Sequence, residues 1–599
     1  MFPQLNPIKR SELVTDTFRG YHHRAKVPDG MWYDMRNLSA DEYPVMATRA
    51  PRGEIASVTA PRGMIAKDAI AYVDGTMLYY NGNAVTFNSG VGLSSSASML
   101  PKRIVGMGAY IIIFPDCVYY NTVDSTDNGY LFASFDAPEN GTVTFSPCRM
   151  DGTIYSSVTS SATAPVSPDN GELWLNTGGE THALMQWSSQ QEQWVTIPTV
   201  YTRIGISNVG KAFAQWDGVE ISGVTYSGAD STVAAQAAAL NGSHVIYDKG
   251  DDYIVVAGML DAAFTQTGGL GVERAVPKMD YVVESGNRLW GCRYGLQSGT
   301  VVNELYACKL GDPKNWSCFL GISTDSYRVS LGSDGQFTGA ITFQGYPTFF
   351  KENCIHRVYG TEPSSYQVIT QEYRGVQKGS GASLAIVGQT LYYKSRTDVC
   401  AYDGSAPITV SDSLGDVPYF AAVAGAWKNK YVISMRDGNN AWSLFVYDAV
   451  NGVWTREDST QLVATAAVDE ELYALTTNKL ICLGGKSGTK ESAVPWSCES
   501  GIMIYDHGRY SKANPNHKHL ARFNIRAQLA NYSSMSVYFE YDSQGGWVHA
   551  GTIHGTGLAR TVHMFVVPRR CDHLRMKLEG TNTAKIFSIA RLLEEASDL

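Results

Sequence analysis

The stretch from Arg374 to Pro407 reads RGVQKGSGASLAIVGQTLYYKSRTDVCAYDGSAP. It contains three short apolar runs, SLAIV, TLYYKS and VCAY, which are separated by a Gly-Gln turn and by the polar break RTD. The last run stops at Asp-Gly. Each run is long enough for one strand, and each break is short enough for a hairpin. The stretch therefore predicts an antiparallel meander.

The same order of apolar run, polar turn and aromatic-rich run recurs along the chain. Copies begin at residues 68, 108, 286, 345, 388, 429 and 470, and most of the intervals are close to 40 residues. A period of this length with several strands per period is typical of a β-propeller blade. Because one blade cannot bury both of its faces, blades must stack around an axis and close into a ring. We predict an all-β chain with a β-propeller of roughly six to eight blades.

The interval between the copies at residues 108 and 286 is much longer than one blade. A loop of this length without structure of its own is uncommon, so the interval predicts an inserted domain. The composition changes there as well, to Ser/Thr-rich segments such as SSVTSSATAPVSPDNG. The insertion also contains a predicted helix, STVAAQAAALNG, with Ser231 or Thr232 as its expected N-cap and Gly242 as its expected end.

Apolar and polar residues alternate in the last hundred residues, which predicts a separate antiparallel β-sandwich. The predicted core positions are Phe523, Ile525, Val537, Phe539, Val562, Met564, Leu574, Met576 and Leu578. The N-terminal segment lacks this alternation and is predicted to be an extended arm that packs on a neighbour. The predicted organisation is an N-terminal arm (1–55), first blades (56–140), an inserted β-rich domain (141–275), the remaining blades (276–490) and the C-terminal sandwich (491–599).

Charge and cysteine content exclude several classes of protein. The net charge is −9, and the acidic excess lies in the middle of the chain, whereas a sequence-reading nucleic-acid binder concentrates Lys and Arg on one face. Contact with DNA that slides past without adhering stays open, because like charges repel. The ten cysteines form no C-x-x-C pair, so most are expected to be buried thiols. No signal peptide or membrane span is predicted, and folding in a reducing cytoplasm is expected.

Motifs for phosphate or metal binding are weak. Gly484–Ser487 reads GGKS, but a phosphate loop requires Gly where Leu480 stands. His517 and His519 could bind a metal, yet no acidic or Cys partner is near them in sequence, so surface histidines in a loop are the favoured interpretation. We predict no catalytic residue, no metal ligand and no cofactor-binding residue.

Glycoside hydrolysis needs two carboxylates at a fixed separation. Asp251, Asp252 and Asp398 stand beside turn residues, where Asp is favoured for local hydrogen bonding alone. Four tryptophans of the insertion could stack on sugar rings or fill a small core, and the core is favoured; they are Trp174, Trp187, Trp194 and Trp216. Three C-terminal arginines are expected to form interface or intradomain pairs rather than phosphate contacts; they are Arg569, Arg570 and Arg575.

Several segments resemble phage virion proteins. GMWYDMRNLSADEYPVMATRAPRG (30–53) resembles the segment that precedes the propeller in many of them. TFFKENCIHRVYGTEPSSYQV, RGVQKGSGASLAIVGQTLYYKSRTDVCAYDG and LFVYDAVNGVWTRED resemble their blades, and VVPRRCDHLRMKLEGTNTAKIFSIARLLEEASD resembles their terminal sandwich. The most similar architecture is that of the tail nozzle, or packaged-DNA stabilisation, proteins of short-tailed phages. The large insertion and the terminal sandwich depart from it, so another tail, neck or capsid-associated role stays open.

The resemblance implies a non-enzymatic structural component of a bacteriophage virion, without a cofactor. Such a protein forms a homo-oligomeric ring at the tail or neck, is assembled in the bacterial cytoplasm, extends or closes the portal DNA channel and anchors other tail parts. Its expected partners are portal, adaptor and tail proteins, with non-specific proximity to packaged DNA. The alternative is a host-recognition protein of the tail that binds a cell-surface glycan through the insertion or the sandwich. A glycan-cleaving enzyme on the same propeller is the weakest of the three hypotheses.

Overall fold

The computed structural model describes residues 10–96, 101–297, 299–506, 512–513 and 517–596, and residues 1–9 of the predicted arm lie outside them. Among the described residues, regular structure is β-strand apart from helix α1 (Ser231–Ala239) and a few short 3-10 helices. The prediction of an all-β chain is therefore confirmed. None of the described helices has the length and apolar character needed to cross a bilayer.

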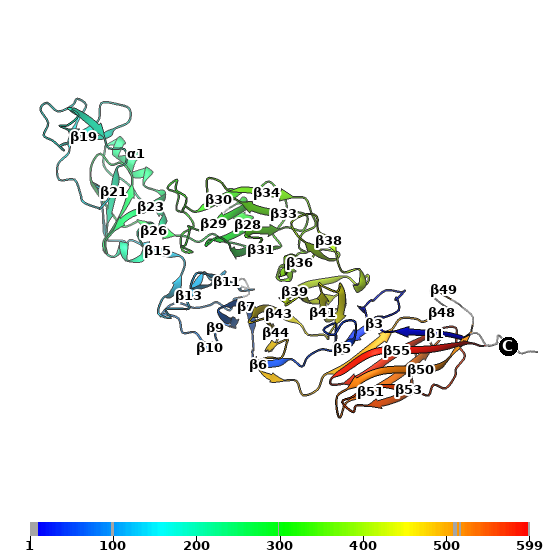
Figure 1. Ribbon diagram of the computed structural model, residues 1–599. Helices are drawn as coiled ribbons and strands as arrows, with labels where there is room; N and C mark the ends of the chain where they lie inside the picture. Colours follow the sequence, from blue (N-terminus) through cyan, green and yellow to red (C-terminus); the bar gives the residue numbers. More distant parts are fainter. Residues whose placement is uncertain (1–9, 97–100, 298, 507–511, 514–516, 597–599) are drawn as a thin grey trace, which may run out of the picture.

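Seven sheets follow one another along the middle of the molecule (Figure 1). In each of the first six, four strands pair antiparallel in the order of the sequence, as the meander pattern predicts. The sheets run from β7 to β10, β11 to β14, β27 to β30, β31 to β34, β35 to β38, β39 to β42 and β43 to β45. Their first strands are β7 (Pro61–Lys67), β11 (Arg103–Met107), β27 (Tyr281–Glu284), β31 (Gly339–Phe343), β35 (Ala385–Val387), β39 (Tyr419–Trp427) and β43 (Leu462–Val468). The first six sheets end at β10 (Asn83–Ala84), β14 (Asn128–Tyr130), β30 (Tyr327–Ser330), β34 (Gln367–Gln371), β38 (Ile408–Thr409) and β42 (Val453–Arg456).

Neighbouring sheets pack against each other through apolar side chains. The first strands of consecutive sheets lie against one another. Between the fourth and fifth sheets, the contact to β31 is made by the 3-10 helix η3 (Gly381–Ser383), which precedes β35. The first strand of the seventh sheet, β43, lies against that of the first sheet, β7. Leu475 of the seventh sheet and Met64 of the first belong to one buried cluster, as Ile113 and Val73 do between the first and second sheets. Contacts between sheets therefore lead from the seventh back to the first.

The seventh sheet takes its fourth strand from the other end of the chain. Strand β6 (Gly53–Ser57) pairs antiparallel with β45 (Lys479–Cys482), with Ser57 opposite Lys479 and Gly53 opposite Cys482. Strand β46 (Thr489–Lys490) adds to the outer edge of β6. Residues more than 400 positions apart in the sequence therefore share one hydrogen-bonded ladder.

The insertion contains an eight-stranded sheet and, farther from the seven sheets, a four-stranded sheet from β17 (Thr159–Ser161) to β20 (Gln193–Thr196) (Figure 1). In the sequence, the first strand of the eight-stranded sheet is β15 (Ala133–Asp136) and the last is β26 (Gly271–Arg274), and these two are neighbours in the sheet. Helix α1 is capped by Asp230, whose carboxylate accepts from Thr232 N and Val233 N. The predicted caps Ser231 and Thr232 are therefore wrong by one or two residues, because Asp is an equally good N-cap. The helix ends before Gly242, with Leu240 as its C-cap.

A buried polar cluster, the base anchor, joins the insertion to the second and third sheets. The Arg274 guanidinium pairs with Asp217 and donates from Nε to Leu131 O at 3.2 Å. Asn315, from the loop between β29 (Thr300–Ala307) and β30, donates to Asp217 Oδ1 at 3.0 Å. Asp217, Arg274 and Asn315 are all buried. The ion pair thus lies within the insertion, and its two members form hydrogen bonds to the second and third sheets in addition to the covalent links.

The C-terminal strands form two six-stranded sheets that share one core, and the predicted N-terminal arm is part of both. Strands β1 (Arg10–Thr15) and β5 (Met46–Thr48) pair with β55 (Ala584–Glu595), and β3 (Met31–Arg36) pairs with β47 (Pro495–Ser500). Trp32 and Leu38 are buried in the common core. The prediction of an extended arm is therefore wrong for residues 10–55. Several of these strands have only two or three residues, too few to produce a recognisable alternation.

The predicted core of the C-terminal region is largely confirmed. Phe523, Ile525, Val537, Phe539, Leu574, Met576 and Leu578 are buried, and Val562 and Met564 pack against the cluster while partly exposed. The rings of Phe523 and Phe539 meet edge to face across the two sheets at 5.3 Å.

Nine of the ten cysteines are buried and Cys117 is partly buried, as the sequence predicts. Burial raises the pKa of Cys308 to about 12 and that of Cys400 to about 11. Because the thiolate is the reactive form, we expect the folded protein to react slowly with Ellman's reagent at about pH 8. After denaturation all ten thiols should react at once. Rapid reaction of several thiols in the folded chain would contradict the assignment of these cysteines as buried.

Candidate functional site

Two arginines just before β6 form a buried ion-pair cluster, here named the arginine clasp (Arg49, Arg52, Glu457, Asp458 and Glu491). Arg52 donates from Nη2 to Glu457 at 2.6 Å and from Nη1 to Asp458 at 2.8 Å. Arg49 binds Glu491 through Nη1 at 2.7 Å. Both guanidinium groups are buried. The clasp therefore joins the N-terminal segment to the connection between the sixth and seventh sheets and to the segment directly after β46.

Acid is expected to weaken the arginine clasp. Burial alone would raise the pKa of Asp458, but the charge of Arg52 and the hydrogen bonds from Thr460 hold this pKa below its usual value. Burial would likewise raise the pKa of Glu491, and hydrogen bonds from Arg49 and Arg52 lower it. Since both folded-state pKa values lie below the unfolded ones, the stabilisation is present above about pH 4 and is lost as the pH falls through the folded values.

Denaturant midpoints measured from about pH 6 to about pH 2.5 test this sign. The wild-type midpoint should fall with acid, and Asp458→Asn should start lower and fall less. Equal falls of the denaturant midpoint in the two proteins would contradict a contribution of Asp458 to the acid sensitivity.

A cavity with a volume of about 690 Å³ lies beside the clasp. Its walls come from the sixth and seventh sheets and from the segment around β46. The lining residues are Arg52, Glu54, Trp442, Ser459, Thr460, Gln461, Thr476, Thr477, Asn478, Lys479, Ile481, Thr489, Lys490, Glu491, Ser492 and Ala493. We name this space the clasp cavity.

A second cavity of about 520 Å³ lies where the chain returns from the insertion to the third sheet. Asp280 is the one carboxylate among the residues that line it. Its Oδ1 pairs with Arg293 at 2.7 Å, and its Oδ2 accepts from Tyr294 N at 2.8 Å. The guanidinium of Arg103 lies 3.8 Å over the Tyr281 ring. Two-carboxylate glycoside hydrolysis requires a second acid, which this lining does not contain.

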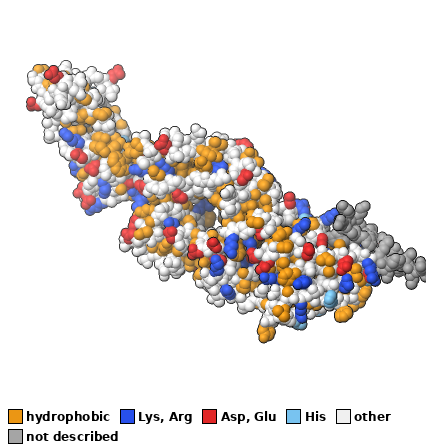
Figure 2. Space-filling model, viewed as in Figure 1, with side chains coloured by type: hydrophobic (Ala, Val, Ile, Leu, Met, Phe, Trp, Pro, Cys, Tyr) orange, Lys and Arg blue, Asp and Glu red, His pale blue; other side chains and the backbone are white. Residues whose placement is uncertain are grey.

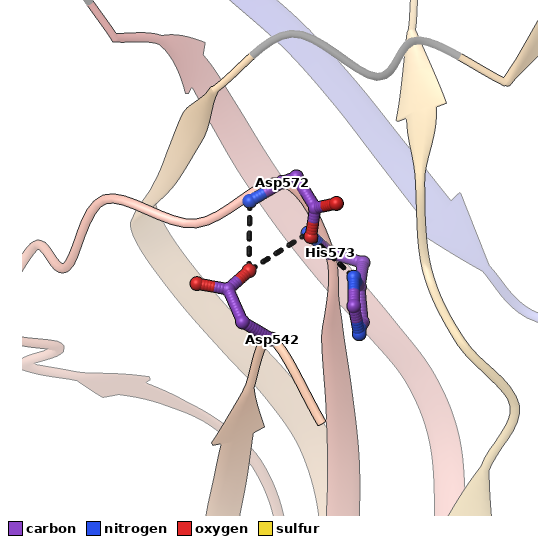
Figure 3. A group of neighbouring side chains, drawn as sticks. All are labelled: Asp542, Asp572 and His573. Atoms are coloured by element: carbon purple, nitrogen blue, oxygen red, sulfur yellow. Dashed lines mark hydrogen bonds and ion pairs between the residues drawn. The ribbon is translucent and has the colours of Figure 1, made fainter. Parts of the chain in front are cut away.

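Asp542, Asp572 and His573 form a small cluster in the C-terminal region, with ligand atoms within 4.8 Å of one another (Figure 3). Several of their polar atoms already have partners. Asp542 accepts from Asp572 N at 2.9 Å, while His573 Nδ1 pairs with Asp572 and its Nε2 contacts Ser543 Oγ at 2.7 Å. The geometry suits a hydrogen-bonded turn better than an ion site.

A chelation experiment separates these two interpretations of the cluster. Addition of EDTA is expected to leave the melting temperature unchanged, whereas Asp542→Ala should cost about 1–3 kcal/mol because backbone donors lose a charged acceptor. A melting temperature that drops with EDTA and recovers with Zn²⁺ would show that the cluster holds a metal.

The acidic candidates from the sequence lie at two places, Asp251 and Asp252 in the insertion and Asp398 in the fifth sheet. Asp251 is exposed, and Asp252 Oδ1 accepts from Asn208 N at 2.7 Å in a turn. Asp398 pairs with Arg374, and Ser395 and Thr409 donate to it. This bonding accounts for Asp at positions 252 and 398.

The basic and histidine candidates also have structural contacts. Lys486 of the GGKS segment pairs with Glu471 at 3.3 Å, and Arg575 lies between Glu499 and Glu540 at 3.2 and 3.1 Å. Arg569 donates to Gln544 at 2.9 Å, and Arg570 contacts His517. His517 is exposed, whereas His519 lies on strand β50 (Lys518–Leu529) and contacts Glu594 at 3.3 Å. The prediction that both histidines lie in a loop is thus wrong for His519.

The insertion tryptophans divide between core and surface. Trp174 is buried, and its indole N–H donates to Ser161 O at 3.0 Å. Trp187 and Trp194 are partly exposed and meet edge to face at 5.5 Å. Trp216 is also partly exposed and packs against Tyr247. The core interpretation is therefore confirmed for Trp174, while Trp187 and Trp194 present part of their rings at the far end of the insertion.

Sequence reasoning missed both the clasp and the base anchor. The RAPR segment at 49–52 carries the only hint of the clasp, because two closely spaced arginines precede a strand-like run. Its acidic partners lie about 400 positions away, and no local pattern connects them.

Comparison with known proteins gives little further information. No protein-family model and no curated protein matches the sequence. Among solved structures, PorZ, a surface component of the type-IX secretion system of Porphyromonas gingivalis, aligns with 11% identity and a TM-score of 0.26 over 89% of this chain and 82% of its own. An exo-β-1,3-galactanase from Phanerochaete chrysosporium aligns with 10% identity and a TM-score of 0.20 over 52% and 94% of the two chains. A Trypanosoma rangeli sialidase aligns with 9% identity and a TM-score of 0.20 over 98% and 96%. At these values the likeness assigns neither a family nor an activity.

Proposed function

We propose that the chain is a seven-bladed β-propeller with an inserted β-rich domain and a C-terminal β-sandwich, and that it serves as a non-enzymatic structural protein of a bacteriophage virion. The ring contacts described above support the propeller, since the seventh sheet packs on the first and β6 supplies its last strand. Closing a ring with a strand from the other end of the chain makes local opening costly. A rigid disc of this kind suits a virion protein that must withstand mechanical force.

The observation that carries the proposal is the path of residues 10–57. They pair with both C-terminal sheets and then enter the last blade, so one continuous segment supplies strands to both the sandwich and the propeller. Such a segment restrains relative movement of the two units, as a spacer between other virion parts requires. The sequence resemblance to nozzle-type proteins agrees with this use.

In the proposed role, copies of the chain form a homo-oligomeric ring at the tail or neck that extends or closes the portal DNA channel. Portal, adaptor and tail proteins would bind its outer surfaces. On the face seen in Figure 2, acidic and basic side chains are interspersed rather than gathered by sign. Such a surface favours transient proximity to DNA over adhesion.

Electron microscopy of intact phage particles, with the protein labelled, tests the proposal. A ring of label at the portal vertex is expected. Label confined to the distal tip of the tail would favour host recognition instead, and particles without label would contradict a virion role altogether.

Host recognition is the second candidate, and the partly exposed Trp187 and Trp194 favour it. They lie on the sheet of the insertion that is farthest from the seven blades (Figure 1). If they form a glycan platform, the full chain should bind host envelope fragments, and the double change Trp187→Ala and Trp194→Ala should remove that binding. The nozzle proposal predicts no binding that depends on these two tryptophans.

A further inference from the structure

We propose that the clasp cavity is a binding site for a neutral oligosaccharide. This site is separate from the insertion, and its residues 491–493 lie on the segment that leads into the C-terminal sandwich. It lies between the sixth and seventh sheets, where the loop at 459–461 faces the turn at 476–479 and the β46 segment. Its volume of about 690 Å³ is within the range of small-molecule sites, about 300–1,000 Å³.

Uncharged hydrogen-bonding groups dominate the wall of the cavity. Five side chains on it make no hydrogen bond to another residue in the described part of the chain: Ser459, Gln461, Thr477, Thr489 and Ser492. The amide Nδ2 of Asn478 likewise donates to no described residue. Hydroxyl and amide groups that donate and accept at once match the hydroxyl groups of a sugar.

The charged groups of the wall are largely neutralised by one another. Glu54 pairs with Lys479 at 2.6 Å, and Glu491 pairs with Arg49. Arg52 is bound by Glu457 and Asp458, although its buried Nε–H has no acceptor in the described structure. Lys490 is the remaining charged residue, and it lies exposed on the outermost strand. An anion would require unpaired cations, so the wall favours a neutral ligand.

Trp442 supplies an apolar surface among these polar groups. It begins strand β41 (Trp442–Asp448), is partly exposed and is the only tryptophan on the wall. An aromatic face packs against the C–H groups of a sugar ring while the surrounding side chains bond its hydroxyls. A tryptophan within a ring of free amides and hydroxyls is thus the feature that distinguishes this cavity from the one beside Asp280.

The test uses the full-length chain and three neutral trisaccharides: maltotriose, cellotriose and triacetylchitotriose. Calorimetric titration up to about 10 mM should show one-to-one binding of at least one of them. Gln461→Ala and Asn478→Ala, both at partly or fully exposed positions, should weaken that binding by about tenfold or more, and Trp442→Ala should weaken it further. The matched control Trp187→Ala should leave it unchanged.

Three outcomes would overturn the proposal. They are no binding of any of the three sugars, binding that survives both Gln461→Ala and Asn478→Ala, and binding that depends on Trp187 instead. The result does not depend on folding of the Trp442→Ala variant, because the two polar variants test the same wall.

Discussion

Replacement of Arg52 by alanine is expected to lower the free energy of unfolding by about 3–5 kcal/mol. The change removes the closest partner of Glu457 and Asp458 and leaves these buried carboxylates with only the longer contacts to Arg49, at 3.6 and 3.9 Å. It also removes the hydrogen bond from Nη1 to Thr460 at 2.9 Å. Denaturant titration monitored by tryptophan fluorescence measures the effect.

Arg24→Ala is the matched control for this experiment. Arg24 is 42% exposed, and its carboxylate contacts with Asp412 and Asp416 are 3.9 and 3.7 Å long. Exposed pairs of this kind contribute about 0–1 kcal/mol. Equal losses in the two variants would show that the clasp does not hold the last blade.

Replacement of Asp217 by alanine should release the insertion from the blades. The guanidinium of Arg274 would stay buried without its carboxylate, and the Asn315 amide would lose one of its two acceptors, so a local cost of about 3–5 kcal/mol is expected. Hydrogen exchange should rise in β22 (Gly218–Ser222) and in β26 while the blades keep their protection.

Asp251→Ala is the control for the base anchor. Asp251 is 74% exposed and lies 4.0 Å from Lys211, so exchange should not change. Uniform destabilisation of insertion and blades by Asp217→Ala would mean that they unfold as a single unit, contrary to a separately anchored insertion.

The repeated meanders could be predicted from the sequence because their signal is local. In the stretch from Thr390 to Tyr402, two apolar runs flank a polar break, and the structure places strands β36 (Thr390–Lys394) and β37 (Val399–Tyr402) there. The alternation at Phe523 and Ile525 likewise marks one buried face of β50. Strand period and turn chemistry are both contained within a dozen residues.

Other features could not be predicted, because they depend on residues far apart in the sequence. Strand β4 (Leu38–Ser39) has two residues, and its burial is decided by the C-terminal sheets that surround it. The carboxylates that neutralise Arg52 follow the sixth sheet, more than 400 positions along the chain. The clasp cavity has the same origin, since Trp442, Asn478 and Thr489 meet only when β6 has completed the seventh sheet.

The most direct test of the account is hydrogen exchange at strand β6 in the native full-length chain. The central claim is that residues 53–57 belong to the seventh sheet and join propeller to sandwich. The amides of β6 that face β45 should then exchange as slowly as those of β45 itself, and only through opening of the whole sheet. Exchange of the 53–57 peptide within seconds, beside a protected β45, would contradict a ring closed by the N-terminal strand.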